Sequence, residues 1–227
     1  MKFFTFDEDL DRQVKHIRSR IRLLMNGEVA QQLRDSGLDY SRMYGVSLIH
    51  LRKLSQEFQP SNGLADRLWH LAFRETRILA TMLAKRDELS DALLAEWADG
   101  ITNIEMAEQM AFNLLGRRAG SDEILKTWLL HPQLYVRYAA LMSVGWQFRF
   151  VGNELAPWVK QNLFTMERLT SEAKLVHPVS HCLKMAGRFD AELRPAIAHF
   201  AKGWVGSDDK VLQAAGEEIL FELEAAE

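Results

Sequence analysis

The sequence predicts an all-α protein, folded as an α-solenoid of antiparallel helical pairs. Apolar residues recur at helical spacing almost throughout, as in Leu68, Leu71 and Ala72, whereas sustained alternation of apolar and polar residues is hard to find. Frequent helix-breaking residues leave room for roughly a dozen helices of ordinary length. Because the linkers are short, neighbouring helices must run antiparallel, and a stack of such pairs is favoured over a closed bundle.

The boundaries of these helices follow from residues that start or stop helices. In chain order the predicted breaks are Asn26-Gly27, residues 59–63, Gly116, Gly120-Ser121, His131-Pro132, Gly152-Asn153, Pro178, Gly187 and residues 206–208. Ser121 and the Ser207-Asp208 pair are predicted N-caps, because their side-chain oxygens can accept hydrogen bonds from first-turn N–H groups.

Composition places the chain among soluble folded proteins. Its 227 residues are 48% hydrophobic and 26% charged, which predicts a single helical-repeat domain over residues 1–227, with N-terminal helices in residues 1–40. One cysteine, Cys182, excludes an internal disulfide and a multi-cysteine zinc cluster. No apolar run is long enough for a signal peptide or a membrane span, so we expect a cytoplasmic protein without a membrane partner.

Charge is distributed unevenly along the chain. Residues 205–227 hold seven acids and one base, a net charge of −6; since the whole chain carries −3, residues 1–204 carry +3. We expect this acidic C-terminal helix to cap the solenoid, although covering its groove is the alternative. Bases gather in residues 12–22, and they form either a solvated helix face or a surface for DNA or a partner.

Five segments, in order, resemble the DNA alkylation repair glycosylases of the AlkD-like HEAT-repeat family. They are the Tyr-Gly-Val and Leu-Arg-Lys-Leu motifs of residues 44–54, Leu-Trp and Arg-Glu-Thr-Arg of residues 68–80, the stretch 97–110, Leu-Tyr-Val-Arg-Tyr of residues 134–141, and residues 179–190. Short motifs of this kind are weak singly and stronger in sequence. The similarity spans about residues 40 to 205.

This resemblance implies a curved HEAT-like solenoid whose concave basic groove binds duplex DNA. It also implies excision of N3- or N7-alkylated purines by a monofunctional glycosylase that uses no metal and no other cofactor. A carboxylate near the sugar would stabilise the oxocarbenium-like transition state and position water, while aromatic faces would attract the cationic base.

The resemblance assigns site residues one by one, and three of them depart from the family pattern. Glu108 falls on the catalytic Asp position, one helical turn after Ile104, which replaces a Trp. His181 replaces a second Trp.

The DNA-binding positions keep more of the family's character. Arg137 retains the phosphate-contacting Arg, with Tyr135 in the aromatic position beside it, and Tyr44 comes from the early Tyr-Gly-Val motif. Lys184 replaces an Arg, which keeps the charge without the bidentate fork.

Each of these candidates has a purely structural alternative. Glu108 can be a solvent-facing helix residue, and Glu105 fits a local structural role better than a site role. His177 and His181 share helical spacing with no third ligand nearby, so we predict no metal site. Of the tryptophans only Trp97 is a site candidate. The other five (Trp69, Trp128, Trp146, Trp158, Trp204), with Met106 and Met110, are predicted to lie in the core.

Two functional hypotheses remain at this point. The first is a monomeric DNA alkylation repair protein that binds double-stranded DNA, alkylated or structurally unusual, and excises alkylpurines with Glu108. The second is a catalytically degenerate scaffold that binds unusual DNA structures or a protein partner, motivated by the joint loss of both aromatic walls at Ile104 and His181. Salt-dependent binding of DNA would favour the hypotheses in which the protein binds nucleic acid, whereas a scaffold for a protein partner predicts no such binding.

Overall fold

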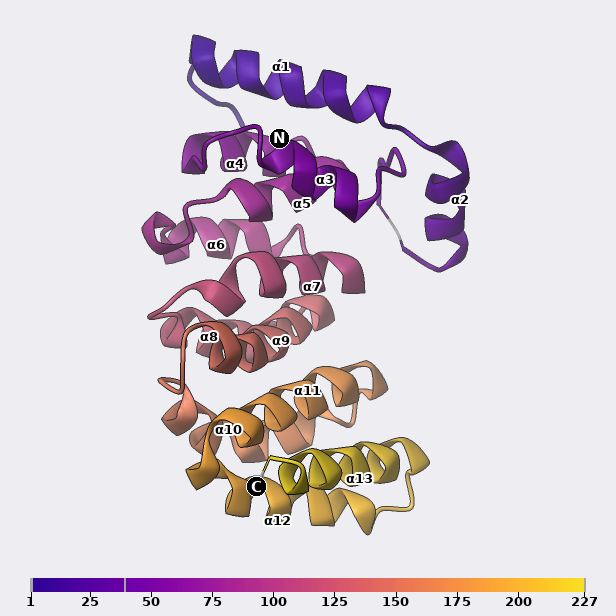
Figure 1. The fold of residues 1–227 in the computed structure, drawn as a ribbon, viewed down its shortest axis with the longest axis vertical. Coiled ribbons are helices and arrows are strands. Elements are labelled where there is room, and N and C mark those ends of the chain that lie inside the picture. The colour runs from indigo at the N-terminus through magenta and orange to yellow at the C-terminus, as the bar shows by residue number, and fades with distance from the viewer. Residues whose placement is uncertain (1, 39, 227) are drawn as a thin grey trace. The chain divides into compact units, whose positions relative to one another are not determined.

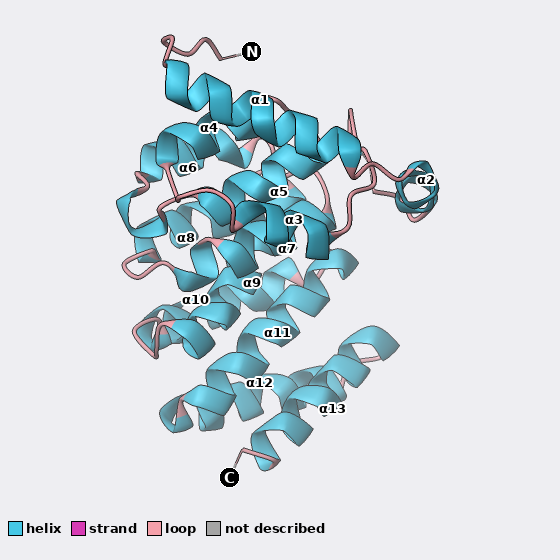
Figure 2. Ribbon diagram, turned by 45° about the horizontal axis from the view of Figure 1, so that its top comes forward, coloured by secondary structure: helices cyan, strands magenta, loops and turns pink. Residues whose placement is uncertain are grey.

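A computed structural model describes residues 2–38 and 40–226, and within them the chain forms helices and no strand (Figures 1 and 2). The all-α prediction is confirmed for this part of the chain. The α-helices are α1 (Glu8–Leu23), α2 (Gly27–Asp35), α3 (Leu48–Ser55), α4 (Asn62–His70), α5 (Arg74–Leu83), α6 (Asp91–Ala98), α7 (Ile104–Asn113), α8 (Asp122–Leu129), α9 (Leu134–Phe150), α10 (Ala156–Leu169), α11 (Ala173–Phe189), α12 (Arg194–Val205) and α13 (Lys210–Glu224). Short 3-10 helices are η1 (Arg86–Glu88), η2 (Leu115–Arg117) and η3 (Ala191–Leu193).

The chain divides into two compact units, Met1–Leu114 with α1 to α7 and Leu115–Glu227 with α8 to α13. Each unit has its own apolar core, because amphipathic helices bury one face against their neighbours. Leu51, Leu64 and Ile78 are fully buried in the first unit, and Val159 and Leu183 in the second. A single domain over the whole chain stays a prediction.

In the first unit, hydrogen bonds recur between residues one structural repeat apart. Bonds that span 31 residues include those from Tyr44 N to Glu75 Oε1, from Arg74 Nε to Glu105 Oε2 and from Trp97 Nε1 to Asp66 Oδ1. Arg74 and Glu105 join the starts of α5 and α7, and Thr81 and Asn113 join their ends at 3.0 Å. These two helices therefore run parallel, as equivalent helices of successive repeats do.

The second unit repeats this arrangement with α9, α11 and α13. Between α9 and α11, Tyr138 bonds His177 at 3.1 Å, and Trp146 contacts His181 with ring centroids 4.9 Å apart. The later residue of α9 contacts the later residue of α11, so these two helices run parallel. The ion pairs that join α11 to α13, described below, span 34 residues and give the same order.

Two predicted breaks are wrong, because α11 continues through both Pro178 and Gly187. Proline removes one backbone bond, but α11 packs against α9, α10, α12 and α13 and Pro178 is buried, and this packing outweighs that loss. Gly187 is needed for close packing instead, since a Cβ there would overlap Cδ2 of Leu223 on α13.

Both predicted serine caps also need correction. Ser121 occupies the N-cap position of α8 without a capping bond, and its hydroxyl donates to the Arg118 carbonyl at 2.8 Å. The helix α13 begins later than predicted and is capped by Asp209, whose carboxylate accepts from the N–H groups of Val211 and Leu212. An Asp carboxylate can accept from two first-turn donors, and its negative charge is favourable at a helix N-terminus.

The core predictions for large side chains hold with one exception. Four of the five tryptophans predicted to be buried, and both methionines of α7, are at most 4% exposed: Trp69, Trp128, Trp158, Trp204, Met106 and Met110. Trp146 of α9 is only half-buried. No helix among the described residues combines the length and hydropathy that a membrane crossing needs.

Candidate nucleic-acid interface

The segment that resembles the family's catalytic stretch, residues 97–110, begins at the end of α6, crosses a short loop and continues into α7. Asn103 caps this helix, accepting from the Met106 N–H at 3.0 Å. Ile104, the first residue of α7, is 43% exposed, and Glu108 lies one turn later with its side chain half-buried. Residues four apart share a helix face, so the structure places Ile104 and Glu108 side by side, as the resemblance implied.

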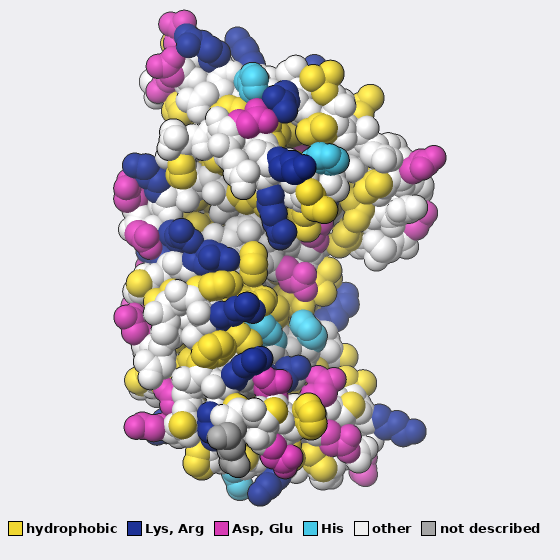
Figure 3. Space-filling view, in the orientation of Figure 1, with side chains coloured by type: hydrophobic (Ala, Val, Ile, Leu, Met, Phe, Trp, Pro, Cys, Tyr) yellow, Lys and Arg dark blue, Asp and Glu magenta, His cyan; other side chains and the backbone are white. Residues whose placement is uncertain are grey.

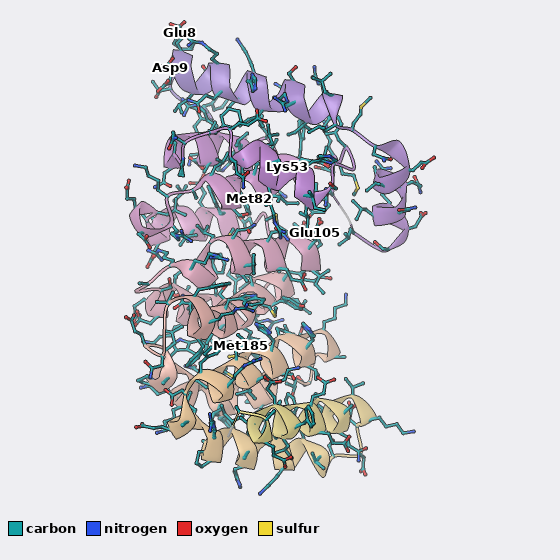
Figure 4. All side chains as sticks on the ribbon, viewed as in Figure 1. Glu8, Asp9, Lys53, Met82, Glu105 and Met185 are labelled. Carbon is teal, nitrogen blue, oxygen red and sulfur yellow. The ribbon has the colours of Figure 1, made fainter. Side chains whose placement is uncertain are left out.

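Glu105, between them, is committed to the fold. Arg74 grips its carboxylate with two bonds, Nε to Oε2 at 2.8 Å and Nη2 to Oε1 at 2.6 Å, and the Tyr40 hydroxyl donates to it at 2.9 Å. Burial raises the pKa of Tyr40, and the adjacent Glu105 raises it further, so this phenol remains a donor. The structural role predicted for Glu105 (labelled in Figure 4) is confirmed.

Arg74 and Glu75 extend this cluster to the loop before α3. The Arg74 guanidinium is 3% exposed and also donates to the Val46 carbonyl at 2.8 Å. The fully buried Glu75 accepts from the N–H groups of Tyr44 and Val46 at 3.0 and 3.3 Å. The family-like Arg-Glu motif therefore fixes the 40–47 loop against α5 and is a structural motif in this protein.

Trp97, a site candidate from the sequence, belongs to the core. It is fully buried, stacks on Trp69 with ring centroids 4.7 Å apart and an interplanar angle of 7°, and donates from Nε1 to Asp66 at 3.0 Å. A side chain without exposed surface cannot contact a DNA base. Assigning Trp97 to the site was wrong, because its nearness in sequence to α7 does not give it a shared face.

Tyr44 is half-buried in the first unit. Its ring meets Phe73 edge to face, with centroids 5.8 Å apart, and together with Arg18 and Arg22 of α1 these two rings line a small surface depression. The depression has no room for a water molecule, so these side chains form a packed contact at the surface of the first unit.

Elsewhere on α1 the predicted basic cluster is partly neutralised. Arg12 pairs with Glu8 at 3.1 Å and Arg20 pairs with Glu57 at 3.0 Å, while Lys15 is exposed.

In the second unit, Arg137 and Tyr135 lie in the first turn of α9. Arg137 Nη2 is 2.7 Å from Oε1 of Glu172, and Tyr135 has Lys174 over its ring at 5.7 Å. The Arg137 side chain is 17% exposed, and its Nε is buried without a hydrogen-bond partner. This cation is thus held at the surface by one carboxylate, which a phosphate can replace.

His181 lies inside the contact between α9 and α11. Its ring packs against Trp146, and Gly145 makes room for it, since a Cβ there would come within 2.6 Å of His181 Cδ2. Burial lowers the pKa of His181 to about 4, with smaller contributions from the nearby His177 and Lys184. The imidazole is therefore neutral at physiological pH, and it packs against the protein where the family presents an aromatic wall.

Lys184, one turn after His181, is 29% exposed and pairs with Glu218 of α13 at 3.0 Å. Arg188, a further turn on, is 59% exposed and pairs with Glu222 at 3.1 Å. Sequence reasoning missed Arg188; the signal for it was the four-residue spacing from Lys184, which puts both bases on one helix face.

Neither a nucleophile nor a metal centre is apparent among the described residues. Burial raises the pKa of the fully buried Cys182 to about 12, which keeps it a thiol. No three side chains of His, Cys, Asp or Glu gather there in a way that could hold a metal ion. His177 and His181 instead face different partners, Tyr138 and Trp146.

Parallel helices whose contacts join residues about one repeat apart define a helical-repeat protein. A comparison with protein families matches residues 17–174 to the DNA alkylation repair enzyme family, and the chain belongs to that family. A comparison with curated proteins finds no match.

A comparison with solved structures finds a protein described as a member of a new family related to the HEAT-like repeat DNA glycosylases with affinity for branched DNA structures. The likeness has a TM-score of 0.71 at 16% sequence identity and covers 93% of this chain and 94% of the other. The α-solenoid fold of HEAT-like repeats predicted from the sequence is confirmed.

Proposed function

We propose that this protein binds DNA by its phosphate backbone and prefers branched or otherwise unusual DNA over plain duplex. The observation that carries this proposal is a contrast between two groups of positions. Two cations and an aromatic ring remain partly exposed, at Arg137, Lys184 and Tyr135. By the resemblance, Ile104 and His181 take the places of the two aromatic walls. The groups suited to phosphate contacts are therefore retained, whereas the aromatic groups suited to recognising a base are replaced.

The loss at these two walls weakens selection for a cationic base. An isoleucine has no π face, so Ile104 offers no cation–π attraction, which an aromatic face would supply at about 0.5–2 kcal/mol. His181 is turned into the protein against Trp146. Phosphate contacts need neither wall, because they fix position along DNA without reading the base.

Preference for branched DNA is supported by the similar solved structure, whose own family is described by affinity for such structures. At 16% identity that likeness concerns the fold, so the preference is a proposal for this chain.

Fluorescence anisotropy with a labelled duplex, a four-way junction and a single strand, each over a salt series, tests the proposal. We expect tighter binding to the junction and a linear fall of log affinity with log salt. Arg137→Ala and Lys184→Ala should each weaken binding and reduce the salt slope by about 1. Arg168→Ala and Lys160→Ala, exposed bases of the same unit outside the family-like positions, are the matched controls. Absence of salt-dependent binding to all three probes at low salt would refute the proposal.

Excision of alkylated purines is a second candidate, favoured by the partly exposed position of Glu108 one turn after Ile104. A carboxylate there would stabilise the sugar cation that forms as the weakened N-glycosidic bond of an alkylated purine breaks, and would orient the attacking water. The base leaves as the free purine and water supplies the new C1′ hydroxyl, so no other reactant is needed.

The assay for this second candidate is release of 7-methyl- or 3-methylpurine from methylated DNA, with an active alkylpurine glycosylase as positive control. We expect Glu108→Gln to abolish release and Glu167→Gln, an exposed helix residue, to leave it intact. Absence of release by the wild type eliminates excision and leaves the binding proposal standing.

A further inference from the structure

Two carboxylates of the acidic helix α13 pair with two bases of α11. Lys184 Nζ lies 3.0 Å from Glu218 Oε2, and Arg188 Nη1 lies 3.1 Å from Glu222 Oε1. Both bases and both acids are four residues apart, so on each helix they stand one turn above the other. Over this part of the second unit, basic and acidic side chains lie next to each other on the surface (Figure 3).

These ion pairs are not what holds α13 in place. The contact between α13 and its neighbours, called the apolar seam below, is closely packed. Ile219 is fully buried and Leu223 covers Gly187. A Cβ on Gly216 would lie only 2.7 Å from the carbonyl oxygen of Ala201. The two ion pairs lie at the rim of this seam, with the acid of one pair 66% exposed and the base of the other 59% exposed. Exposed pairs of this kind contribute little to stability.

The paired bases lie beside a position that the family resemblance assigns to the groove. Lys184 is close enough to His181 for its charge to help lower the pKa of that imidazole, after burial and His177. Side chains four residues apart on a helix have Cβ atoms about 5–6 Å from each other, so Lys184 and Arg188 present two cations in succession on one face of α11. Glu218 and Glu222 therefore hold two negative charges where two phosphates would fit.

We propose that Lys184 and Arg188 form a site for two successive phosphates of a DNA strand, and that Glu218 and Glu222 occupy this site until DNA displaces them. The inference rests on the proposed DNA-binding function and adds Arg188 and an internal competitor to it. The exchange needs only the two acidic side chains to turn into solvent, because the apolar seam keeps α13 docked.

The rival interpretation is that these ion pairs are ordinary contacts between successive repeats. Such a contact exists in the first unit, where Arg74 and Glu105 join α5 to α7. That pair is bidentate, and its side chains are only 3% and 12% exposed, so it is part of the core. The α11–α13 pairs are single bonds open to water, which an external anion can reach.

The test compares two double variants of the full-length protein that remove equal charge from α13. In Glu218→Gln/Glu222→Gln the paired acids are neutralised, and in the control Glu217→Gln/Glu224→Gln two exposed acids of the same helix are neutralised. Affinity for a labelled junction is measured at low salt. We expect the first variant to gain roughly three- to tenfold, as released competition from two surface pairs implies. The control should gain about twofold or less through screened long-range charge.

Adding Lys184→Ala/Arg188→Ala to the first variant should remove its gain. Thermal unfolding by circular dichroism must show that α13 remains folded in each variant, and a melting temperature close to wild type is expected. Equal gains in the two glutamine variants, or a gain that survives loss of both bases, would overturn the proposed site while leaving DNA binding intact. If the wild type and every variant fail to bind DNA, the proposed function fails and this inference fails with it.

Discussion

Lowering the pH from 7.5 to 5 should destabilise the second unit through His181, and His181→Gln should remove that part of the loss. Burial against Trp146, with His177 and Lys184 nearby, lowers the pKa of this imidazole from 6.5 to about 4 in the folded protein. Between these values the unfolded chain binds a proton that the folded chain does not. Stability from this group is therefore complete above pH 6.5 and is lost as the pH falls toward 4.

The expected magnitude follows from those two pKa values. At pH 5 the unfolded imidazole is almost fully protonated and the folded one almost fully neutral, which lowers the free energy of unfolding by about 2 kcal/mol relative to pH 7.5. Urea unfolding followed by circular dichroism at the two pH values measures this loss in wild type and variant. His199→Gln, which removes an exposed histidine of the same unit, should retain the wild-type loss. If His181→Gln loses as much stability as wild type, the imidazole is not held neutral by its burial.

Three further changes test the packing that supports the site. Arg74→Ala leaves the Glu105 carboxylate without its bidentate partner and should destabilise the first unit by about 3–5 kcal/mol in urea unfolding. Gly145→Ala forces a methyl group against His181 and should cost about 1–3 kcal/mol, seen as a lower melting temperature. Trp97→Phe keeps the ring stack but removes one of the partners of Asp66 Oδ1, which His70 Nδ1 still contacts at 3.0 Å, for an expected loss of about 0.5–1.5 kcal/mol.

Each of these changes has a matched control. Arg52→Ala removes an exposed arginine of α3 and should change stability by less than about 0.5 kcal/mol, so an equal effect of Arg74→Ala would refute the buried cluster. Gly203→Ala adds a methyl group where nothing lies within 4 Å, and in a helix it should be neutral or stabilising. For Trp97→Phe, an unchanged urea midpoint would mean that the bond to Asp66 contributes nothing.

The sequence predicted the helical class, most of the core and the likeness to a repair family, because these depend on local periodicity and short motifs. It placed Ile104 and Glu108 correctly on one helix face, since a four-residue spacing fixes that relation by itself. It failed for Trp97, which belongs to the same segment but packs on Trp69 of an earlier helix. It also failed for Pro178, where burial of the surrounding helix outweighs a single lost backbone bond.

The partners of the charged residues were decided by tertiary structure alone. Arg137, Lys184 and Arg188 find their carboxylates 34 or 35 residues further along the chain, one structural repeat away. No local pattern carries that information, because the register between successive helices depends on how their apolar faces pack. From the sequence, the acidic C-terminus was known only by its net charge of −6, and it was predicted either to cap the solenoid or to cover its groove. In the structure it is the helix α13, and two of its carboxylates, Glu218 and Glu222, pair with Lys184 and Arg188 of α11.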